Sequence, residues 1–127
     1  MEVFKTKWLA RFAHRERIPD NVLIEAIQRA ERGPVDADLG GGLSKQRAAR
    51  VGQGRSGGYR MLVAWRARGR TIFIYGFARN ERDNTGPDEL ATAREVAAGW
   101  LSADTRRIEQ GLAEGEIQEI FYGDEET

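Results

Sequence analysis

Residues 59–65, YRMLVAW, and residues 71–77, TIFIYGF, are two apolar runs separated by a turn around Arg68 and Gly69. Both runs are rich in β-branched and aromatic side chains, which favour pleated strands. The second run is apolar at almost every position, which is typical of a strand covered on both of its faces. The stretch therefore predicts two adjacent strands, of which the second lies in the middle of a sheet.

Upstream of these strands, residues 36–50 predict a hairpin that turns at the three glycines 40–42 and returns through a polar, basic strand. Residues 1–33 predict a short strand followed by two helices. The first helix is expected to bury an aromatic stripe, and the second to begin at Pro19 and end before Gly33. The stripe is expected to consist of Phe4, Trp8 and Phe12 with Leu9 beside them.

Downstream, Pro87 and the two carboxylates that follow it predict a helix over residues 87–101. A short helix is expected from Asp104 to Leu112, with Gly115 ending it and a final edge strand over 116–122. At 127 residues, the chain is expected to form one domain: a helical pair (1–33), a basic sheet (36–82), a helix (87–101) and an acidic C-terminal extension (104–127).

Charge is sorted along the chain, although 20 basic and 20 acidic side chains cancel overall. Residues 1–43 carry 7 of each, residues 44–82 carry 10 basic and 1 acidic, and residues 83–127 carry 3 basic and 12 acidic. A block as basic as the middle third attracts phosphate backbones. The alternative is a solvated face that the acidic third balances.

Composition excludes several classes of site. The chain has no cysteine and one histidine, so neither thiolate nor histidine clusters for a metal are expected. No apolar run reaches the roughly 18 residues of a membrane span, and no signal peptide is evident, so we expect a cytoplasmic protein without a cofactor. The one histidine, His14, lies off the aromatic stripe and is expected at the surface.

Residues 52–57, GQGRSG, match the spacing of a dinucleotide-binding glycine loop. That loop requires an apolar strand before it and a helix after it, whereas here a polar stretch precedes and a predicted strand follows. Two interpretations remain open: a flexible loop that carries Arg55 past a nucleic-acid backbone, or a long hairpin connection.

The basic residues of the middle third can converge on one concavity if the registers of neighbouring strands agree. Residues 60, 62 and 64 share one face of their strand, as do 73, 75, 77 and 79, provided that no bulge intervenes. Arg60 and Arg79 are the pair that we expect to face a shared ligand, and the alternative is that these charges protect an edge strand from aggregation. The cations concerned are Lys45, Arg47, Arg50, Arg60, Arg79 and Arg82.

The run from Arg79 to Asn84 follows the predicted central strand, at a place where catalytic residues commonly lie on loops. Glu81 is the only acidic residue in the basic block. It is either an ion-pair partner that positions arginines or a general base whose proton affinity those arginines set.

Five motifs follow one another along the chain: FKTKW at 4–8, DADLGGGL at 36–43, KxRxxR at 45–50, GQGRSGGYR at 52–60 and YGFARNER at 75–82. In combination they resemble the RelE superfamily toxins of type II toxin-antitoxin systems, in the HigB-like branch, over about residues 2–121. The resemblance implies an α+β fold, a small twisted, mainly antiparallel sheet with helices packed on one face. It also implies an endoribonuclease that acts on mRNA in the ribosome and is silenced by a cognate antitoxin, expected to be a small helix-turn-helix protein.

Cleavage of RNA without a metal requires attack of the 2′-hydroxyl on the adjacent phosphorus. Arg60 and Arg79 are the expected stabilisers of charge on phosphorus, because a guanidinium stays charged and binds phosphate oxygens with two donors. Lys45 and Glu81 compete for the role of general base. Residues expected to bind RNA around them are Arg47, Arg50, Arg55, Tyr59, Tyr75 and Arg82.

Some members of the superfamily place a histidine near the C-terminal end of the sheet, and this chain has only His14. A weak, ribosome-assisted catalyst is therefore expected. Two other interpretations stay open: a toxin of the same fold that inhibits DNA gyrase, and an RNA-binding module without catalysis.

Overall fold

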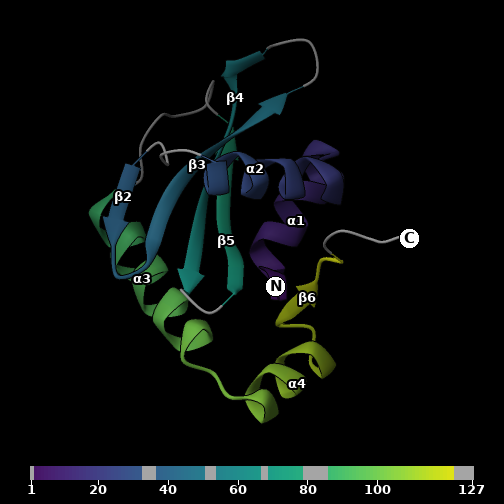
Figure 1. The fold of residues 1–127 in the computed structure, drawn as a ribbon, viewed down its shortest axis with the longest axis vertical. Coiled ribbons are helices and arrows are strands. Elements are labelled where there is room, and N and C mark those ends of the chain that lie inside the picture. The colour runs from purple at the N-terminus through teal and green to yellow at the C-terminus, as the bar shows by residue number, and fades with distance from the viewer. Residues whose placement is uncertain (1, 33–36, 51–53, 67–68, 79–85, 122–127) are drawn as a thin grey trace.

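A six-stranded mixed sheet organises the chain in the strand order β2-β3-β4-β5-β1-β6 (Figure 1). The computed structural model describes residues 2–32, 37–50, 54–66, 69–78 and 86–121. β1 runs parallel to β5, and every other pair is antiparallel. The predicted α+β, mainly antiparallel fold is confirmed. The strands are β1 (Glu2–Thr6), β2 (Ala37–Gly40), β3 (Leu43–Arg50), β4 (Gly54–Arg66), β5 (Arg70–Ala78) and β6 (Ile117–Glu119).

Helices cover both faces of the sheet. α1 (Lys7–Glu16) and α2 (Asp20–Arg32) pack on one face, and α3 (Pro87–Leu101) and α4 (Thr105–Ala113) pack on the other. We call these the α1 face and the α3 face. The single covered face that the resemblance implied is therefore corrected to two. The reason lies in the interior strands: Met61 and Val63 of β4 enter the first core, and the alternating Leu62 and Ala64 enter the second.

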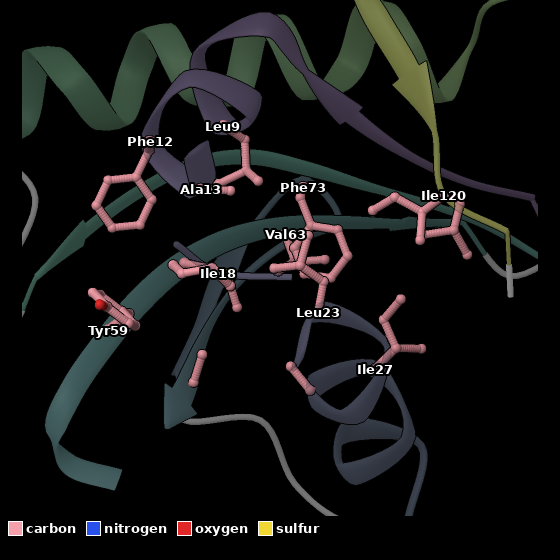
Figure 2. Close-up of a cluster of buried hydrophobic side chains, with 14 of the residues drawn as sticks. Leu9, Phe12, Ala13, Ile18, Leu23, Ile27, Tyr59, Val63, Phe73 and Ile120 are labelled. Carbon is pink, nitrogen blue, oxygen red and sulfur yellow. The ribbon is translucent and has the colours of Figure 1, made fainter. Parts of the chain in front are cut away.

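The core of the α1 face is built on leucine and phenylalanine from α1 rather than on the predicted aromatic stripe. Figure 2 shows Leu9 and Phe12 together with Leu23 and Ile27 of α2, packed around Val63 and Phe73 of the sheet. By contrast, Phe4 lies in β1 and enters the opposite core, and Trp8 is 46% exposed. The predicted stripe ran across the junction between β1 and α1, so Phe4, Trp8 and Phe12 do not lie on one face of a helix.

The remaining boundaries agree with the sequence. Gly86 caps α3 and Asp104 caps α4, where its side chain accepts a hydrogen bond from the N–H of Arg107. β6 forms the predicted edge strand beside β1. Gly54 pairs with Arg50, so residues 54–57 belong to β4, and Arg55 lies in a strand and not in the expected flexible loop. Residues 52 and 53 of that predicted loop lie outside the described residues.

A β-bulge interrupts β5 at Ile74. Leu62 pairs with Tyr75, whereas the next residue of β4, Val63, pairs with Phe73, which leaves Ile74 as the extra residue. Thr6 holds this bulge, because its buried hydroxyl donates to the Ile74 carbonyl at 2.6 Å. The same oxygen accepts from the N–H of Leu9 at 3.2 Å and so caps α1. One side chain thus joins β1, the bulge and the start of α1.

We expect Thr6→Val, which keeps the shape of the side chain but removes both hydrogen bonds, to lower the free energy of unfolding by roughly 2 kcal/mol. The loss follows because the Ile74 carbonyl and the first-turn N–H of Leu9 are left unsatisfied in the interior. Urea unfolding measures the change. Thr6→Ser retains the oxygen and serves as the control, with less than half of the loss. Equal stability of Thr6→Val and the parent would contradict this role.

Candidate functional site

Two rows of side chains cross β3, β4 and β5 on the α3 face. In the first row, Lys45 pairs with Leu62, which pairs with Tyr75. In the second, Arg47 pairs with Arg60, which pairs with Phe77. Directly opposed residues in antiparallel strands have Cβ atoms about 5 Å apart, and successive rows on one face are two residues apart. Three of the predicted cations therefore share one small area of the sheet, which we call the basic rows (Lys45, Arg47 and Arg60).

The basic rows combine buried and exposed charge. Arg60 is only 5% exposed, and its Nη1 donates to the carbonyl of Tyr59 at 3.4 Å. Arg47 is exposed and Lys45 is half-buried. Two guanidinium groups at directly opposed positions repel each other, and an anion shared between them offsets that repulsion. Planar guanidinium groups bind phosphate oxygens through paired donors, which makes a phosphate a suitable anion here.

The bulge at Ile74 decides which aromatic side chains accompany the basic rows. Phe73 enters the core of the α1 face, whereas Tyr75 and Phe77 are register partners of Leu62 and Arg60 and so lie on the α3 face. The expected shared face of residues 73, 75 and 77 is therefore wrong. The extra residue reverses the alternation halfway along β5, and this reversal brings Tyr75 and Phe77 beside the cations.

Tyr59 lies on the opposite face from the basic rows. It is 4% exposed, its ring meets Phe12 edge-on with centroids 5.6 Å apart, and its hydroxyl donates to Oε1 of Glu16 at 3.3 Å. Its ring is part of the core beneath α1. Tyr59 is therefore not brought together with the other predicted RNA-binding residues.

One arginine of the basic block supports the fold instead. Arg70 is buried, and its guanidinium binds Oε1 of Glu2 at 2.9 Å and the carbonyls of Trp100 and Ala103 at 3.0 and 2.7 Å. These bonds join the start of β5 to the C-terminal end of α3. The positive charge of the middle third is therefore not all directed at a ligand.

Several predicted site residues lie outside what the structure describes. Arg79, Glu81 and Arg82 fall in residues 79–85, so the expected meeting of Arg60 with Arg79 remains a prediction. For Arg50 and Arg55, at the paired ends of β3 and β4, the structure describes the backbone but not the side chain.

An apolar cavity of about 420 Å³ lies next to the basic rows. Tyr75 lines it together with Trp8, Ile74 and Val96, and Asp88 and Glu89 at the start of α3 also line it.

The sequence analysis placed Trp8 in the core and gave Phe77 no role at the site. Trp8 follows the N-cap Thr6 by two residues, and this position within the first turn of α1 is the signal that could have separated it from the buried stripe.

The described part of the chain holds no group of three or more His, Asp or Glu side chains that could bind a metal ion. None of its helices has both the length and the apolar character that a membrane span requires. His14 is exposed, as expected.

Comparison with known proteins gives one clear relationship. The family model described as the RelE toxin of the RelE/RelB toxin-antitoxin system matches residues 1–120. No curated protein matches the chain. Because the family model spans almost all of the sheet and the four helices described above, the chain belongs to the RelE toxin family.

Proposed function

We propose that this RelE toxin is an endoribonuclease that cleaves mRNA on the ribosome in the cytoplasm, and that it belongs to the HigB-like branch. The observation that carries the proposal is the opposed pair Arg47 and Arg60 with Lys45 in the neighbouring row, on one face of a rigid sheet. Such a cluster suits a ribose-phosphate unit, since it offers several fixed donors to one phosphate.

The proposed reaction is attack of the 2′-hydroxyl oxygen on the adjacent phosphorus, with departure of the 5′-oxygen and without a metal. The low exposure of Arg60 supports a role in stabilising charge on phosphorus, because a guanidinium held in a water-poor site is oriented before the reaction begins. Arg79 is proposed as its partner. Lys45 is the proposed general base, since it lies in the row next to Arg47 and Arg60 on the same face of the sheet. Glu81 is the competing base.

Tyr75 is proposed to stack on a base of the bound RNA. Tyr75 lies beside Leu62 in the row of Lys45, and its ring also lines the cavity that contains Trp8. A base that leaves the stack next to the reacting phosphate therefore has aromatic surface within reach. Arg47, Arg50, Arg55 and Arg82 are proposed to bind neighbouring phosphates.

Membership of the RelE family implies a cognate antitoxin, and we propose that this partner is a small helix-turn-helix protein.

The proposed nuclease activity is tested by in vitro translation: cleaved mRNA in the presence of ribosomes supports the nuclease. Inhibited supercoiling with intact mRNA supports a gyrase-binding toxin, and RNA binding without cleavage supports a non-catalytic module.

Arg60→Lys and Arg47→Ala are each expected to slow cleavage by about 10²-fold or more, because each removes donors that stabilise charge on the phosphorus in the transition state. Primer extension on ribosome-bound mRNA measures the rate. Arg106→Ala, an exposed arginine on α4, is the control and is expected to cleave like the parent. Because Arg60 is buried, each variant is also compared with the parent in thermal unfolding. Parental cleavage rates in folded Arg60→Lys and Arg47→Ala would show that the assigned site is wrong.

Lys45→Arg separates the two candidate bases. It keeps the positive charge but cannot lose a proton near neutral pH, so we expect cleavage to fall by about 10²–10⁴-fold while RNA affinity changes little. The comparison is Glu81→Gln, which keeps the size of the side chain and is expected to retain most of the activity. If Lys45→Arg cleaves normally and Glu81→Gln does not, the general base is Glu81.

A further inference from the structure

A second basic surface lies on α1, away from the basic rows. Lys7, Arg11 and His14 are spaced i, i+4 and i+7 along this helix and are exposed, while Leu9, Phe12 and Ala13 on the other side are buried. The three exposed side chains line a cleft of about 870 Å³. Its far side is bounded by Glu114 and Gly115 of the turn after α4 and by Gln118 of β6. Figure 1 shows α1 beside β6 at this edge of the sheet.

The acidic side chains of the first third neutralise this cleft only in part, although residues 1–43 carry equal numbers of acidic and basic groups. Most of the carboxylates of the first third bind partners that do not line the cleft. Asp20 pairs with Lys5, the one cation of the cleft that is neutralised in this way, at 2.8 Å. The other engaged pairs are Glu2 with Arg70, Glu16 with Arg15 and Tyr59, Glu25 with Arg29, and Asp38 with the N–H of Gly40.

The acidic C-terminal third contributes one carboxylate to the lining of the cleft. Glu114 is the one carboxylate among its lining residues, and its Oε2 accepts from Nε2 of Gln110 at 3.0 Å. The nearby Glu116 is held by Arg107 through two bonds, at 2.8 and 3.2 Å, and this pairing lowers the pKa of Glu116. Lys7 also lies near enough to Glu116 to contribute to the lowering of its pKa, whereas Arg11 makes no ion pair with another described residue. The lining side chains include three cations, Lys5, Lys7 and Arg11, and one carboxylate, so positive charge predominates among them.

The shape and chemistry of the cleft favour a phosphate backbone over bases. From Lys7 to His14, α1 rises about 10 Å. A helical nucleic-acid strand carries a phosphate about every 3.4 Å of its axis, so these three side chains span roughly three phosphates. Among the described residues that line the cleft there is no tryptophan, tyrosine or phenylalanine, so the aromatic surface for base stacking is limited to His14. Contacts of this kind position a nucleic acid without reading its sequence.

We propose that the α1 cleft is a second phosphate-binding surface, which anchors the toxin on structured RNA while the basic rows engage the strand that is cut. This inference rests on RNA as the ligand class of the proposed function. α1 packs on the opposite face of the sheet from the basic rows. A short single strand bound at the rows does not reach both surfaces, whereas a large folded RNA that surrounds the protein does.

The double variant Lys7→Gln/Arg11→Gln tests the cleft, and Arg32→Gln/Arg106→Gln is the matched control with the same loss of charge on exposed positions of α2 and α4. The probe is a labelled RNA hairpin with 2′-O-methyl sugars, which cannot be cleaved because the attacking hydroxyl is blocked. Fluorescence anisotropy gives Kd over a series of salt concentrations. Each lost phosphate contact reduces the slope of log Kd against log salt by roughly 0.7–0.9, so we expect a reduction of about 1.4–1.8 in the cleft variant and none in the control.

Equal slopes for the cleft variant and the parent would overturn the inference, as would an equal reduction in the control. A parent that binds poly-glutamate more tightly than the hairpin would also overturn it, and would indicate an acidic protein as the occupant of the cleft. Cleavage of mRNA on ribosomes is measured in parallel. If the parent cleaves mRNA but the cleft variant keeps the parental salt slope, the cleft proposal is rejected and the nuclease proposal stands. If the cleft variant has a reduced slope but the parent does not cleave mRNA, the nuclease proposal is rejected and the cleft proposal stands.

Discussion

The two hydrogen bonds of the Thr6 hydroxyl are the constraint on which the arrangement of this toxin depends. One bond holds the carbonyl of the bulged Ile74, and the other starts α1 directly after β1. The bulge reverses the alternation of β5, so Phe73 faces one core and Tyr75 faces the other. The aromatic surroundings of the basic rows and the packing of α1 therefore have a common origin in one buried threonine.

Charge in this protein is separated in space as well as in sequence. The basic middle third supplies both the clustered cations of the basic rows and a structural cation, Arg70, which binds the carbonyls at the C-terminal end of α3. The first third is neutral in composition, but several of its carboxylates are engaged: Glu2 pairs with Arg70, Asp20 pairs with Lys5, and Asp38 accepts from the N–H of Gly40. Net charge over a segment is therefore a poor guide to its surface, because pairing decides which charges reach a ligand.

A sheet with cores on both faces is a suitable support for the proposed chemistry. Arg60 projects from the interior strand β4, which is buried on both faces, and Lys45 and Arg47 project from β3, which pairs with β4 along its length. A guanidinium oriented before the substrate arrives needs little rearrangement during the reaction.

The sequence by itself determined the strands of the central hairpin, the helix that Pro87 opens and the segregation of charge, because these depend on local periodicity, turn residues and counting. It also placed Arg47, Arg60 and Lys45 in strands that can converge. Only the tertiary structure decided that Tyr59 is buried under α1, that Trp8 is exposed and that Tyr75 joins the cations. These outcomes depend on register and on one extra residue in β5, which arise from pairing between distant strands and leave no periodic signal in the chain.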